Sequence, residues 1–112
     1  MRALQTATLM RVFVDEGERH GKLPLYMAIV EELRARGFGG ATVLKGIEGY
    51  GSHNVVHSSR VIDAATSLPV LIEVAESEER IRSVVSRLEE MIPEGLITLE
   101  RIQMRLLTKR QV

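Results

Sequence analysis

The order of apolar periods along the chain restricts its fold more than any other feature of the sequence. Residues 7–14 and 41–47 are rich in β-branched and apolar side chains, which is typical of strands. Between them, Leu25, Ile29 and Leu33 recur at the spacing of one helix face. The first part of the chain is therefore predicted to form a strand, a helix and a second strand.

The second half of the chain repeats this order. A third strand is predicted over residues 68–75, and Ser77 is a favourable N-cap for the helix that follows. Apolar residues of that helix recur at i, i+3 and i+4: Ile81, Val84, Val85, Leu88 and Ile92. A final strand is predicted over residues 96–107, where the apolar alternation changes phase at Glu100 and Arg101 and indicates a β-bulge.

The resulting order, β-α-β-β-α-β, is that of the ferredoxin-like split βαβ motif. We therefore expect an α+β sandwich, in which an antiparallel sheet carries both helices on one face. A chain of 112 residues is long enough for one such domain, spanning residues 1–112, and too short for two.

Composition excludes several classes of function. Fifteen Lys and Arg residues balance fifteen Asp and Glu residues, and aromatic residues make up 4%, so nothing favours nucleic acid as a partner. The chain has no Cys, which excludes disulfides and thiolate metal sites. No apolar run reaches the ~18 residues of a membrane span, and we expect a cytoplasmic protein.

The sheet face away from the helices is predicted to be half apolar. Arg11 lies between Leu9 and Phe13 on the first strand, and Glu73 occupies the corresponding place on the third. Because these strands are neighbours in the split βαβ topology, we expect Arg11 and Glu73 to form a pair. A face this apolar is normally covered, which predicts a homo-oligomer.

The connection between the second and third strands is unusually long. A direct hairpin connection takes about two to five residues, whereas the twenty residues 48–67 intervene here. The connection begins with Gly46, Gly49 and Gly51, where glycine permits positive φ and a close approach of a ligand to the backbone. We expect this segment, the long loop (residues 48–67), to be irregular and to carry function.

These segments resemble the PII-like superfamily of signalling proteins. In that superfamily a Gly-x-Thr-Val strand leads to a Gly-aromatic-Gly turn and a long T-loop, as residues 40–43 and 49–51 do here. The chain is most similar to a small uncharacterised branch, a domain of unknown function. The likeness to that branch lies in GKLPLYMAIV (residues 21–30), LPVLIEV (residues 68–74) and EGLITLE (residues 94–100).

The resemblance implies a non-enzymatic regulatory homotrimer. Such trimers bind small anionic ligands, often adenine nucleotides, in clefts between subunits, and the T-loop contacts a target protein such as a membrane transporter or an enzyme. The candidate ligand-binding residues are Gly40, Thr42, Lys45, Gly46, Gly49, Tyr50, Gly51, Arg60 and Arg101. One feature departs from the pattern: PII proteins have a lysine-rich loop after the second helix, whereas residues 93–95 are short and acidic.

Two other classes of function compete with this interpretation. His53 and His57 are four residues apart, so a helical turn would place both on one face, where they could bind Zn²⁺ or Cu²⁺. That arrangement would make the protein a metal-binding trimer. Ser52 and Ser58 lie near these histidines, but no third residue is evident to orient them, which argues against an enzyme.

Overall fold

One four-stranded antiparallel sheet forms the body of the protein. The structure, a computed structural model, describes residues 3–50, 56–58 and 68–108. The sheet order is β4-β7-β1-β8, which is the ferredoxin-like order that the sequence predicts. These strands are β1 (Gln5–Asp15), β4 (Thr42–Lys45), β7 (Pro69–Glu76) and β8 (Leu96–Met104).

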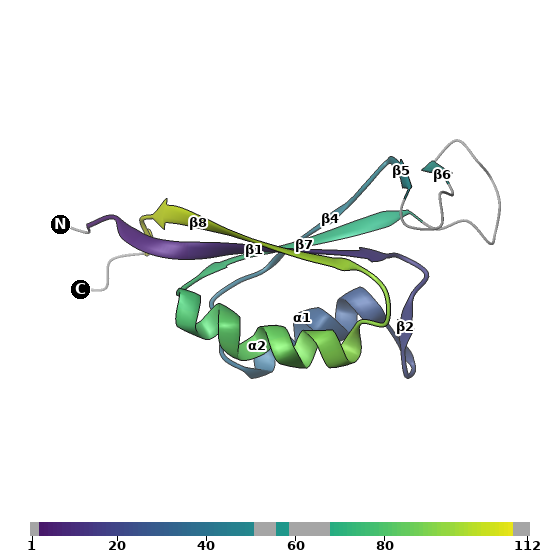
Figure 1. Ribbon diagram of the computed structural model, residues 1–112, viewed down its shortest axis with the longest axis horizontal. Helices are drawn as coiled ribbons and strands as arrows, with labels where there is room; N and C mark the ends of the chain where they lie inside the picture. The colour runs from purple at the N-terminus through teal and green to yellow at the C-terminus, as the bar shows by residue number, and fades with distance from the viewer. Residues whose placement is uncertain (1–2, 51–55, 59–67, 109–112) are drawn as a thin grey trace.

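Both helices cover the same face of the sheet (Figure 1). They are α1 (Leu25–Ala35) and α2 (Glu78–Met91). The Ser77 hydroxyl accepts a hydrogen bond from the Arg80 N–H at 3.4 Å, as expected of an N-cap. No helix in the described part of the chain is long and apolar enough to cross a membrane.

The hydrophobic core lies between the helices and the sheet. Alternate residues of the two central strands point into it, and those on the helices recur every three or four positions. Its fully buried members include Met10, Val12, Ile29, Ile72 and Leu88. The two periods in the sequence therefore predict the layers correctly.

The other sheet face carries a charge pair among apolar side chains. Arg11 Nε lies 2.9 Å from Glu73 Oε2, which confirms the predicted pair, and Arg11 Nη1 lies 3.3 Å from Glu100 Oε1. The hydrogen bond to Glu73 raises the pKa of Arg11 above its usual value. Phe13 is 36% exposed and Leu44 is 48% exposed on this face of the single chain.

The predicted bulge in the last strand is wrong. β1 and β8 pair without interruption from Phe13–Leu96 to Gln5–Met104. Leu99 lies opposite the buried Met10 on the helix face, whereas Ile102 belongs to the other face. The phase changes because β1 and β8 extend beyond α2 toward the chain termini (Figure 1), so the helices no longer cover the strand there. The strand also ends at Met104, short of the predicted boundary at 107.

The segment between β1 and α1 contains a small hairpin that the sequence did not indicate. Strands β2 (Arg19–His20) and β3 (Leu23–Pro24) pair with each other, and the turn between them contains Gly21 at φ 62°. The chain then enters α1 directly after Pro24.

Candidate functional site

The two ends of the long loop meet at Pro69, the first residue of β7. The Gly46 N–H donates to the Pro69 carbonyl at 2.7 Å. A Cβ on Gly46 would lie 2.7 Å from Pro69 Cγ, and one on Gly49 would lie 3.0 Å from the same atom. Gly46 therefore has no room for a side chain beside Pro69, and Gly49 has little. Neither glycine uses the positive φ that its residue type permits; among described glycines positive φ occurs at Gly21 and Gly37.

The long loop begins as a two-stranded ladder, where the sequence predicted irregular structure. Strand β5 (Glu48–Tyr50) pairs with β6 (Val56–Ser58), and Gly49 lies opposite His57. Since β6 is extended, His57 does not belong to the helical turn on which the metal hypothesis depended.

Lys45 ends β4 on the helix side of the sheet, where it meets Glu16. Lys45 Nζ lies 2.5 Å from Glu16 Oε2, and their side chains are 55% and 34% exposed. The Glu16 N–H in turn donates to the Leu68 carbonyl at 2.9 Å. Glu16, Lys45, Gly46, Gly49, Leu68 and Pro69 thus form one contact group, which we call the loop root.

The structure does not gather the remaining predicted ligand residues around the loop root. Thr42 begins β4, three residues and about 10 Å before Lys45, and Gly40 precedes it. Arg101 lies on β8, the opposite edge of the sheet, and two strands separate these edges by about 14 Å. Tyr50 ends β5, but its side chain lies outside the description. Three further candidates lie outside the described residues: Gly51, His53 and Arg60.

The turn after α2 is packed tightly against β1. A Cβ on Gly95 would lie 2.6 Å from the Phe13 carbonyl oxygen and 3.0 Å from Ile92 Cγ2. This turn therefore follows the sheet closely and does not form the open, lysine-rich loop of PII proteins.

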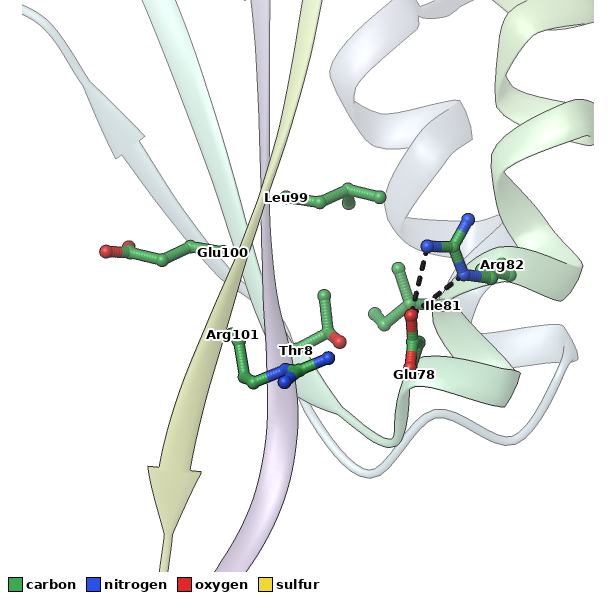
Figure 2. Close-up of a pocket in the computed structure, with 7 residues that line it drawn as sticks. All are labelled: Thr8, Glu78, Ile81, Arg82, Leu99, Glu100 and Arg101. Carbon is green, nitrogen blue, oxygen red and sulfur yellow. Dashed lines mark hydrogen bonds and ion pairs between the residues drawn. The ribbon is translucent and has the colours of Figure 1, made fainter.

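A hollow of about 160 Å³ lies at the other end of the sheet, where α2 begins (Figure 2). It is lined by Thr8, Glu78, Ile81, Arg82, Leu99, Glu100 and Arg101. Arg82 is paired with Glu78 at 3.0 Å. Among the described residues, no group of three or more His, Asp or Glu side chains could hold a metal ion.

Sequence reasoning missed the contacts of Glu16 and Thr8. The signal for Glu16 was available: the Arg11–Glu73 pair fixes a register that puts Asp15 opposite Pro69, next to the end of β4. No sequence signal singles out Thr8, because its surroundings depend on where α2 begins over the sheet.

Comparison with known families gives one strong match. The model of the family DUF190, described as Uncharacterized ACR, matches residues 7–104. A UPF0166 protein of Aquifex aeolicus is 34% identical over 95 residues, covering 85% of this chain and 90% of the relative. A UPF0166 protein of Methanocaldococcus jannaschii is 36% identical over 92 residues, covering 81% and 84%.

Comparison with solved structures identifies the PII-like fold. The nitrogen regulatory PII-like protein CPII of Thiomonas intermedia, bound to ADP, AMP and bicarbonate, superimposes with a TM-score of 0.69 at 15% identity. That match covers 93% of this chain and 92% of CPII. A protein described as PII-like and signalling, from Thermus thermophilus, gives a TM-score of 0.63 at 21% identity, covering 93% and 92%. These matches confirm the predicted fold.

Proposed function

We propose that this chain, which belongs to the DUF190 family, is a non-enzymatic PII-like regulatory protein. It binds a small anionic ligand in clefts between the subunits of a homotrimer, and the long loop reports the bound state to a partner protein. The PII-like fold of solved structures with a TM-score up to 0.69 supports the regulatory role.

The loop root is the observation that carries this proposal. Lys45 provides a cation beside the point where the long loop leaves and rejoins the sheet. An anionic ligand at Lys45 would compete with the Glu16 carboxylate. Since the Glu16 N–H also donates to the Leu68 carbonyl at 2.9 Å, this competition links ligand binding to the end of the loop.

The open sheet face supports assembly into an oligomer. Phe13 and Leu44 expose 36% and 48% of their surface on the single chain, beside the charge pair of Arg11 and Glu73. Among the described residues, the edge strands β4 and β8 each have one side without a paired strand, and natural proteins usually protect such edges. A trimer in which the sheets face inward would cover the apolar face and bring edge strands of neighbouring copies together.

The ligand we expect is a small anion of the kind bound to CPII, which holds ADP, AMP and bicarbonate. The tight turn at Gly95 offers no lysine-rich cradle for a triphosphate. AMP or bicarbonate therefore fits this chain better than ATP does.

Isothermal titration calorimetry tests the proposal with ATP, ADP, AMP and bicarbonate as separate ligands. We expect binding of at least one, with AMP tighter than ATP, and loss of that binding in Lys45→Gln. Arg34→Gln is the matched control, because Arg34 is an exposed cation on α1 whose side chain is 81% exposed. If the protein is trimeric by light scattering but binds none of the four ligands, the ligand assignment is refuted. If it is a monomer, the proposed binding site between subunits is refuted.

A further inference from the structure

The floor of the hollow beside α2 is a buried hydroxyl. Thr8 is only 8% exposed, and its side chain makes no hydrogen bond in the described part of the chain. A buried hydroxyl without a partner is unfavourable, and native proteins seldom leave one. Figure 2 shows the Thr8 oxygen directed toward the open space beside Glu78. The hydroxyl is therefore available to a ligand.

Arg101 supplies a cation next to this hydroxyl. It lies directly opposite Thr8 in the β1–β8 ladder and on the same face, and its guanidinium extends toward Thr8 (Figure 2). Among the described residues, no carboxylate pairs with Arg101. A guanidinium with free N–H groups beside a hydroxyl donor is suited to a carboxylate, which can accept from both.

The acidic groups around the hollow have partners of their own. Glu78 is paired with Arg82 at 3.0 Å, and Glu100 points away from the hollow toward Arg11, 3.3 Å from it. Glu76, on the other side of Thr8, accepts from the Ser77 N–H at 3.2 Å. Arg101 thus has no carboxylate partner among the described residues, so the carboxylate of a ligand can approach it. Because the partner of Glu76 is a neutral N–H, its negative charge remains nearby and disfavours a ligand with more than one negative charge.

Two apolar side chains, Ile81 and Leu99, also line the hollow, beside the Glu78–Arg82 pair. Ile81 is fully buried at its inner wall, and Leu99 is 42% exposed and reaches toward the helices (Figure 2). The volume of about 160 Å³ is well above the ~10–15 Å³ that a single water needs, which is enough for a molecule of a few carbons. The hollow therefore combines the Thr8 hydroxyl and the Arg101 cation with the exposed apolar surface of Leu99.

We infer that this hollow binds a short aliphatic monocarboxylate. Its carboxylate accepts hydrogen bonds from the Thr8 hydroxyl and the Arg101 guanidinium, and its tail lies against Leu99. The site is separate from the loop root, which lies at the opposite sheet edge, so it does not depend on the proposed nucleotide or bicarbonate site. It also reassigns Arg101, which the PII resemblance had placed in an intersubunit cleft.

Titration of the ¹⁵N-labelled protein with butanoate, followed by amide NMR at constant ionic strength, tests the inference. We expect saturable shifts confined to the amides around Thr8, Ile81 and Arg101, and no binding of the neutral analogue butanamide. Thr8→Val should weaken binding about fivefold, the typical net effect of one hydrogen bond, and Arg101→Gln more than tenfold because its bond is charge-assisted.

Control variants separate the site from general effects on the fold. Thr6→Val makes the same change two residues earlier on β1, outside the hollow, and should leave the dissociation constant unchanged. Thr8→Ser keeps the hydroxyl and should retain most of the affinity. Absence of saturable shifts in the wild-type protein would overturn the inference, as would equal affinity of wild type, Thr8→Val and Arg101→Gln. Phosphate binding as tightly as butanoate would overturn the apolar part of the site.

Discussion

Replacing Gly46 by alanine tests whether the glycines of the loop root are required for packing. The added Cβ would lie 2.7 Å from Pro69 Cγ and 3.3 Å from the Pro69 carbonyl oxygen. Carbon atoms normally approach to ~3.5–4.0 Å, so the chain would have to move by about 1 Å. Overpacking of this size costs ~1–3 kcal/mol, and the movement would also weaken the 2.7 Å bond from Gly46 to Pro69. We expect a loss of about 2 kcal/mol in the free energy of unfolding.

Gly40→Ala is the matched control for this substitution. A Cβ on Gly40 would meet nothing within 4 Å, and Gly40 is not among the glycines with positive φ. Alanine there should be neutral or should stabilise the fold by up to ~1 kcal/mol through the unfolded state. Urea unfolding at one protein concentration measures both variants, since concentration affects the stability of an oligomer. Equal midpoints for the two variants would refute the packing explanation and would favour a role of Gly46 in contacting ligand.

Three further predictions concern other sites. Thr8→Val should change the free energy of unfolding by less than about 1 kcal/mol without ligand, because the Thr8 hydroxyl has no hydrogen-bond partner in the described part of the chain and faces the hollow; a larger loss of stability would contradict this. Glu16→Gln should tighten anion binding at Lys45 by up to about fivefold in calorimetry, since the exposed ion pair that it removes contributes at most ~1 kcal/mol. An unchanged affinity would argue against competition between the anion and the Glu16 carboxylate. Hydrogen bonds from Arg36, and then Arg87, lower the pKa of Glu32 below its usual value of 4.5. The ionised Glu32 therefore stabilises the fold fully at pH values above 4.5, and this stabilisation is lost as the pH falls through the lower pKa of the folded state. Glu32→Gln should remove this part of the pH dependence of the free energy of unfolding, and an unchanged pH profile would contradict the prediction.

The fold could be predicted from sequence because each layer has its own period. The two-residue alternation of residues 7–14 and the helical spacing of Ile81, Val84 and Leu88 both point to one core. The same alternation predicted that Arg11 and Glu73 lie on one sheet face as a pair, and they do. The bulge at Glu100 was wrong for a definite reason: a phase change can mean an extra residue or a change in what covers the strand. The sequence alone does not say how far α2 extends over β8.

The candidate site was less predictable because glycine patterns do not distinguish their causes. Gly46 and Gly49 fit a ligand cradle and a tight contact with Pro69 equally well in sequence. Only the positions of neighbouring atoms identify the second cause. Thr8 resembles any strand threonine, and its environment arises from the first turn of α2 lying over β1 and β8. Such contacts join segments about seventy residues apart and leave no local pattern.

A ligand at Lys45 can change the long loop only through contacts that join Lys45 to the ends of the loop. Besides the packing of Gly49 on Pro69, two bonded contacts occur in the described part of the chain. One is the backbone bond from Gly46 to Pro69, which does not depend on the charge of Lys45. The other passes through Glu16, which holds Lys45 by its carboxylate and Leu68 by its N–H. An anion would displace the Glu16 carboxylate from Lys45, and a movement of Glu16 that followed would disturb its N–H bond to Leu68. The proposed switch therefore acts on the returning end of the loop at Leu68, while the outgoing end remains fixed to Pro69.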